Sequence, residues 1–175
     1  MEEHKEAVEQ FRNPDFAHHS AGFFIRSAGR ILLCHATSRK DDSIENVVRD
    51  KRWSIPKGLV EDNETLFDAA CRELQEETGI DLRNEPALRN LFESHSRQVW
   101  KEYSFGKKKR KKLVSVFLLD DEDGLIRNER GTELICTSLI TGMKRLEGVV
   151  ECDFFEWVSP DDCCDWVTRS QRELF

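Results

Sequence analysis

The chain has 175 residues, and its 38% hydrophobic content with 11 Phe and 4 Trp is enough to bury the core of one domain. A formal net charge of −7 argues against nonspecific nucleic-acid binding by the whole surface but leaves room for a local basic site. The longest apolar run is too short for a membrane span, and the charged residues 1–15 do not resemble a signal peptide.

The six cysteines form no CxxC pair and no regular framework, which indicates reduced thiols. We therefore expect a cytoplasmic protein, with the nucleus as a second location, and no membrane partner.

Apolar and alternating patterns predict a series of strands separated by polar stretches. The expected strands, in chain order, are residues 21–26, 31–35, 53–55, 87–96, 99–105, 112–119 and 154–158. The first two form a hairpin, and residues 99–105 and 112–119 form an antiparallel pair. Residues 1–19 are expected to be an N-terminal tail, and residues 37–51 a loop.

A helix is predicted after Gly58, because Leu66, Ala70 and Leu74 recur every four residues and form an apolar stripe. Asn63 or Asp62 can cap its start, and Gly79 ends it.

A second helix is expected over residues 160–175, with Ser159 as N-cap and Pro160 in the first turn. Residues 127–148 are expected to be an insertion with room for a short strand at 134–137. Strands with flanking helices predict an α/β sandwich formed by one domain, residues 20–175.

Four carboxylates gather around the first of these helices: Glu64, Glu73, Glu76 and Glu77. The last three are spaced i, i+3, i+4, so they share a helix face, where like charges repel. Oxygen-rich carboxylate clusters suit Mg²⁺, Mn²⁺ or Ca²⁺. If only the composition of the segment is considered, a solvated acidic helix face is the simpler interpretation.

The spacing of these residues matches a known family pattern, which favours a metal site over a solvated helix face. Gly58, five residues, Glu64, seven residues, and then Arg72-Glu73-Leu74-x-Glu76-Glu77-x-Gly79-Ile80 match every fixed position of the Nudix box. The chain therefore resembles the Nudix hydrolases, and the resemblance implies their α/β/α sandwich with a mixed central sheet. It also implies an enzyme that uses Mg²⁺, or Mn²⁺, to hydrolyse a nucleoside diphosphate linked to another group.

The resemblance assigns roles to the matching residues. Glu73, Glu76 and Glu77 would hold the metal together with the backbone carbonyl of Gly58. Arg72 would orient the glutamates, and Glu64 and Gly79 would support the box. One glutamate, Glu77 or Glu76, could serve as the base toward water.

Residues Trp53-Ser54-Ile55-Pro56-Lys57-Gly58 lead into the box. This pattern resembles diadenosine tetraphosphate hydrolases and also messenger-RNA decapping enzymes. It predicts a proline-stiffened turn that brings Lys57 to the phosphates, whereas Trp53 is expected to be a core aromatic.

Residues 103–119 resemble a stretch of the dinucleoside polyphosphate hydrolases, which implies that Tyr103 and Lys112, or a neighbour, contact the substrate. The unbroken basic run Lys107 to Lys112 departs from that pattern, and RNA, inositol polyphosphates or an import receptor are alternative partners. The resemblance also implies a further metal-binding or catalytic glutamate outside the box. Glu102 is the first choice, and the other candidates are Glu93, Glu133, Glu151 and Glu156.

The favoured function is hydrolysis of dinucleoside polyphosphates such as diadenosine tetraphosphate. The alternatives are a capped or triphosphorylated RNA 5′ end, a diphosphoinositol polyphosphate and, in another class, a non-catalytic Nudix-fold regulator that binds nucleotide or RNA.

Overall fold

The computed structural model describes residues 10–39, 44–94, 98–107, 110–129 and 133–175. Its strands are β1 (His18–Ser27), β2 (Arg30–Ala36), β3 (Trp53–Ser54), β4 (Lys57–Leu59), β5 (Lys101–Phe105), β6 (Lys112–Asp121) and β7 (Cys152–Val158). Its helices are α1 (Ile44–Arg49), α2 (Leu66–Thr78), α3 (Pro86–Glu93) and α4 (Cys163–Trp166), with a π-helix at Leu125–Glu129 and a 3₁₀-helix at Arg169–Leu174.

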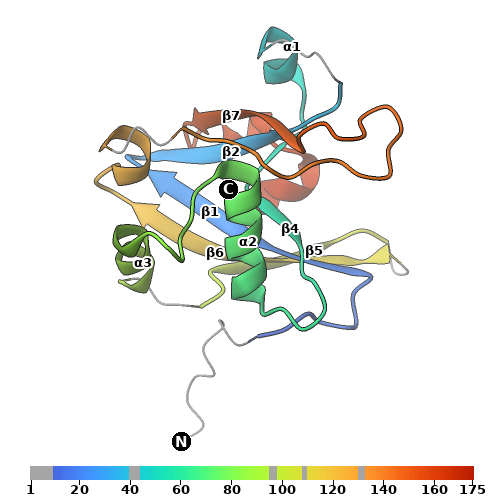
Figure 1. Ribbon diagram of the computed structural model, residues 1–175, viewed down its shortest axis with the longest axis horizontal. Coiled ribbons are helices and arrows are strands. Elements are labelled where there is room, and N and C mark those ends of the chain that lie inside the picture. Colours follow the sequence, from blue (N-terminus) through green and yellow to red (C-terminus); the bar gives the residue numbers. More distant parts are fainter. Residues whose placement is uncertain (1–9, 40–43, 95–97, 108–109, 130–132) are drawn as a thin grey trace, which may run out of the picture.

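The strands form one mixed sheet in the order β3-β2-β1-β6-β5, with β4 paired to β1 and β7 paired to β2 (Figure 1). β1 and β6 are parallel over their whole length, and the other pairs are antiparallel. The predicted hairpin and the antiparallel pair β5–β6 are therefore confirmed.

Each face of this sheet carries a hydrophobic core cluster. The side chains of a strand point alternately to one face and to the other, so one strand contributes to both clusters. Phe23 and Ile25 of β1 belong to a core cluster that contains the apolar stripe of α2 and residues of α3. Phe24 of β1 belongs to a second cluster on the opposite face, with Cys163, Val167 and Leu174 of the C-terminal segment. The predicted α/β sandwich with a mixed sheet is confirmed.

The box helix α2 begins later than the sequence predicted. Its N-cap is Thr65, whose hydroxyl accepts a hydrogen bond from the Asp68 amide at 3.0 Å, and not Asn63 or Asp62. Asn63 instead has a φ of 63° in the preceding turn. Gly79 ends the helix in the left-handed conformation with a φ of 79°, as predicted.

Several other predictions are wrong. Residues 87–93 lie in α3 and not in a strand, because Pro86 occupies its first turn and Leu88 and Phe92 bury one helical face, whereas residues 95 and 96 lie outside the described part of the chain. The predicted loop 37–51 contains α1.

The C-terminal helix is replaced by α4 and the 3₁₀-helix, separated where Val167 is extended and pairs with Trp53. No strand forms at 134–137, since the Ile135 and Thr137 amides donate to the Thr78 and Glu76 carbonyls at the end of α2.

The predicted tail, residues 1–19, lies partly outside the described residues. Residues 10 and 11 lie against the box, since Phe11 pairs with Thr65 and the Leu66 amide donates to the Gln10 carbonyl. Residues 18 and 19 are the first two residues of β1 and not part of a tail. None of the described helices is long and apolar enough to cross a membrane.

Candidate active site

Arg72 is the hub of the box. Its Nε and one terminal nitrogen donate to the two Glu64 carboxylate oxygens at 2.9 and 3.0 Å, which is a bidentate pair. Its other terminal nitrogen donates to Glu73 at 2.7 Å and to Glu76 at 3.2 Å. A further bond to the Leu59 carbonyl at 2.9 Å ties the guanidinium to β4. One cation therefore orients three carboxylates and fixes the helix against the strand before it.

Gly58 is a glycine because the Glu73 carboxyl group lies against it. A Cβ at Gly58 would lie 2.0 to 2.2 Å from the carboxyl atoms of Glu73, far inside contact distance. Gly58 pairs with Ala21 of β1, and next to it Gly22 leaves space for Pro56 and Lys57, which its own Cβ would overlap. A side chain at residue 58 would therefore displace the Glu73 carboxyl group from its present position.

Glu77 is hydrogen-bonded to the same strand, β4. Its carboxylate accepts a hydrogen bond from the Lys57 amide at 2.8 Å. Lys57, Gly58 and the three helix glutamates Glu73, Glu76 and Glu77 are therefore brought together. Helix spacing predicted this for the glutamates, whereas the resemblance implied it for Lys57 and Gly58.

The site has more negative charge than its own cations balance. Burial raises the pKa of Glu77 to about 8, against the attraction of Lys57, and burial also raises the pKa of Glu73 despite its bond to Arg72. The hydrogen bonds that Arg72 donates to Glu64 and then to Glu73 raise the pKa of its guanidinium further. A divalent cation would stabilise the ionised glutamates, so the oxygen-rich donor set fits Mg²⁺ or Mn²⁺.

The structure places Tyr103 and Lys112 outside the contacts of this cluster. Tyr103 is buried in the second core cluster, and its hydroxyl accepts a bond from Gln171 at 2.9 Å. Lys112 is exposed, with its ammonium 5.9 Å from the Phe105 ring centroid.

Lys112 nevertheless lies at the box end of the sheet, since it pairs with His18 of β1, two residues before the Ser20–Leu59 pair. Lys107, Arg110 and Lys111 of the basic run are also exposed, whereas residues 108 and 109 lie outside the described part of the chain.

A polar chain that runs from buried His19 and Ser115 to exposed Glu102 was not predicted. The Asn13 amide donates to His19 Nδ1 at 2.9 Å, so Nε2 carries the proton and donates to Ser115 Oγ at 2.7 Å. Ser115 then donates to Glu102 at 2.9 Å. Burial lowers the pKa of His19, against the attraction of Glu102. Glu102 had been expected as an additional acidic residue, whereas His19 in the sequence resembled part of a polar tail.

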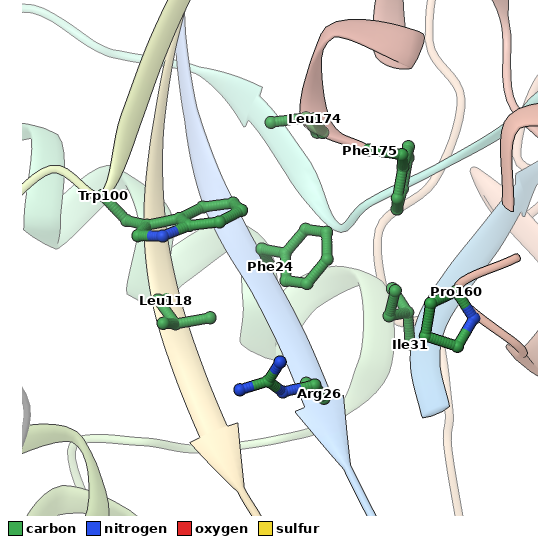
Figure 2. A pocket seen from close by; sticks show the side chains of 8 residues that line it. All are labelled: Phe24, Arg26, Ile31, Trp100, Leu118, Pro160, Leu174 and Phe175. Carbon is green, nitrogen blue, oxygen red and sulfur yellow. The ribbon is translucent and has the colours of Figure 1, made fainter. Parts of the chain in front are cut away.

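A separate cavity of about 300 Å³ opens on the sheet face opposite α2 (Figure 2). It is lined by Phe24, Arg26, Ile31, Trp100, Leu118, Pro160, Leu174 and Phe175. Phe24 lies between Trp100 and Phe175, with ring centroids 4.8 and 5.5 Å away. Arg26 is paired with Asp120, so the cavity is apolar apart from one compensated charge.

With this geometry in place, comparison with known proteins identifies the family. The model of the NUDIX domain matches residues 17–174, which is nearly the whole chain. The chain belongs to the NUDIX domain family. The matched residues include the Arg72, Glu73, Glu76 and Glu77 cluster.

Among individual relatives, Nudix hydrolase 10 of Arabidopsis thaliana is 40% identical over 53 residues, which are 30% of this chain and 18% of the relative. The RNA pyrophosphohydrolase of Bartonella quintana is 59% identical over 29 residues, 17% of each chain. The matches thus span less than a fifth of these curated relatives.

The solved structures include a bifunctional NMN adenylyltransferase/ADP ribose pyrophosphatase of Francisella tularensis, complexed with AMP and a Mn ion. It matches with a TM-score of 0.57 and 17% identity, over 90% of this chain and 39% of that one. At this identity the likeness concerns the fold.

Proposed function

We propose that this Nudix protein is a divalent-metal-dependent pyrophosphohydrolase acting on a nucleoside diphosphate linked to another moiety. The observation that carries the proposal is the Arg72 network, which gathers Glu64, Glu73 and Glu76 beside Gly58 and leaves an excess of negative charge. An acidic helix face that served only solubility would leave its carboxylates exposed to water. Glu73 is instead buried and held by Arg72.

Glu73, Glu76, Glu77 and the Gly58 carbonyl would hold Mg²⁺, with Mn²⁺ as a substitute. When bound, the ion supplies charge neutralisation for the pyrophosphate and activation of water. Arg72 holds the glutamates in register, so little reorganisation accompanies the reaction.

Lys57 places a positive charge at the start of β4, where it can bind a phosphate oxygen. Glu77 or Glu76 would accept the proton of the attacking water.

For the substrate we propose dinucleoside polyphosphates such as diadenosine tetraphosphate. A long polyphosphate carries several negative charges in line, and the chain offers Lys57 beside Gly58 and exposed Lys112 at the same end of the sheet. Tyr103 remains a proposed contact for the substrate only through the resemblance to this group.

A capped or triphosphorylated RNA 5′ end is the second candidate. Exposed Lys107, Arg110 and Lys111 extend the positive charge beyond what one polyphosphate needs, which favours a longer phosphate backbone. The similarity to an RNA pyrophosphohydrolase is consistent with this candidate.

The test is product release from a panel of diadenosine tetraphosphate, capped RNA, triphosphorylated RNA, ADP-ribose and a diphosphoinositol polyphosphate, with Mg²⁺ or with EDTA. Each substrate is run with the wild type, Glu76→Gln and the control Glu122→Gln, an exposed change beyond β6. The proposal expects metal-dependent turnover that falls at least about 100-fold in Glu76→Gln only.

Turnover unaffected by Glu76→Gln would refute the site. Preference for an RNA end over the dinucleotide would keep the reaction and replace the substrate. Binding without turnover would favour a non-catalytic regulator.

A further inference from the structure

Three buried cysteines gather at the end of the box helix, in a place that the sequence did not indicate. Cys34, Cys136 and Cys152 form their own small core cluster and come from three separate segments of the chain. All three are reduced thiols. Because thiolate sulfur is a soft ligand, such a cluster has a chemistry different from that of the oxygen-rich box.

The fold explains why they meet. Cys34 and Ala36 of β2 project to the same face of the sheet, and Cys152 of β7 is the pairing partner of Ala36, so the two thiols are diagonal neighbours. Cys136 lies between two residues whose amides bond to the last turn of α2, the Ile135 amide to Thr78 and the Thr137 amide to Glu76. In Figure 1 this orange segment passes the upper end of α2.

Glu77 completes the cluster. The Cys34 and Cys152 sulfurs and a Glu77 carboxylate oxygen all lie within 4.8 Å of one another. Two sulfurs at about 2.3 Å from a tetrahedral ion are about 3.8 Å apart, so a small contraction would bring all three into one coordination sphere. Cys136 lies outside this group of three but contacts Cys152, since its sulfur accepts the Cys152 amide at 3.4 Å, so a shift of its segment would add it as a fourth ligand.

We propose that Cys34, Cys152 and Glu77, with Cys136 as the fourth ligand, form a binding site for a thiophilic divalent cation such as Zn²⁺ or Cd²⁺. Glu77 is the partly exposed member of the set, so the ion enters from the side of the box. Binding displaces the thiol protons to solvent and leaves metal–thiolate bonds, with no change of oxidation state.

The site shares Glu77 with the proposed catalytic cluster. A cation held by the thiolates draws the Glu77 carboxylate away from the hydrolytic Mg²⁺, so occupancy inhibits hydrolysis. This consequence rests on the proposed function, whereas the binding itself does not.

The test uses the whole protein in excess Mg²⁺, which occupies oxygen-only sites, titrated with Cd²⁺ and followed by ultraviolet thiolate-to-cadmium charge-transfer absorption. The wild type should saturate at one equivalent. Cys152→Ser and Cys34→Ser should each weaken binding at least about tenfold, and Cys164→Ser, which removes a thiol outside the cluster, should leave it unchanged.

Thermal unfolding of every variant in the absence of Cd²⁺ verifies that the substitution leaves the fold intact. Cys136→Ser, in a segment outside the sheet, provides a second change if a strand variant fails to fold. No charge-transfer band in the wild type, or an unchanged titration in the folded cluster variants, overturns the proposal.

If a substrate is found, Zn²⁺ should inhibit the wild type and require at least about tenfold more metal to inhibit Cys152→Ser. Equal inhibition of both proteins would overturn the shared role of Glu77. A normal cadmium titration without hydrolysis of any substrate would instead count against the proposed function alone.

Discussion

Glu77→Gln should stabilise the metal-free protein at neutral and alkaline pH, although it removes a residue proposed for catalysis. The amide keeps an oxygen that can accept the Lys57 amide hydrogen bond, now 2.8 Å long. Because the amide is neutral, the folded protein no longer holds an ionised carboxylate in a mostly buried position, which is unfavourable. The substitution therefore measures how much the ionised Glu77 carboxylate destabilises the metal-free protein, separately from the role of Glu77 in hydrolysis.

The size of the effect follows from linkage. Burial raises the pKa of Glu77 from 4.5 to about 8 in the folded protein. A carboxyl with a raised folded pKa contributes stability that is complete below pH 4.5 and is lost as the pH rises toward 8. At pH 7 the loss amounts to about 3 kcal/mol, at about 1.4 kcal/mol for each pH unit above the unfolded pKa.

Thermal unfolding in EDTA between pH 5 and pH 8 measures this difference. At pH 7 the variant should melt about 6 to 12 °C above the wild type, and the gap should close toward pH 5. Mg²⁺ should raise the melting temperature of the wild type and have less effect on the variant. Glu122→Gln should follow the wild type. A wild type without pH dependence, or a variant that is less stable at pH 8, would refute the reasoning.

Three further changes test the box. Gly58→Ala should fold with a loss of about 1 kcal/mol, because the flexible Glu73 side chain can move away, but hydrolysis should fall about 100-fold as that carboxylate is displaced; unchanged turnover would contradict the contact. Arg72→Lys should lower the free energy of unfolding by about 1.5 to 3 kcal/mol in urea, since one ammonium cannot replace the bidentate bond to Glu64, and a neutral result would show that the network is not structural. Gly79→Ala should cost about 1 to 2 kcal/mol from the left-handed backbone while the Michaelis constant stays the same, and kinetics beside the melting curve would expose any effect on the site.

The amino-acid sequence was sufficient for the box because its chemistry is local. Arg72, Glu73, Glu76 and Glu77 lie within two helical turns, so helix geometry alone places them together once Leu66, Ala70 and Leu74 define the buried face. Gly79 ends the helix for a reason contained in its own backbone.

The secondary-structure predictions were wrong where the local sequence pattern suits more than one element. Residues 87–96 are apolar enough for a strand, but Pro86 and the spacing of Leu88 and Phe92 suit a helix, and packing against β6 decided between them. The C-terminal segment has a helix-like start, yet pairing of Val167 with Trp53 interrupts it.

Other features depend on tertiary structure alone. His19, Ser115 and Glu102 form one hydrogen-bonded chain only because β1, β6 and β5 are neighbours, and their separation along the sequence hides the contact. Cys34 and Cys152 meet Glu77 because β2, β7 and α2 converge. The sequence thus determined the ligands that one helix can carry, whereas the sheet determined which distant side chains surround them, since strand pairing joins residues without regard to their distance along the chain.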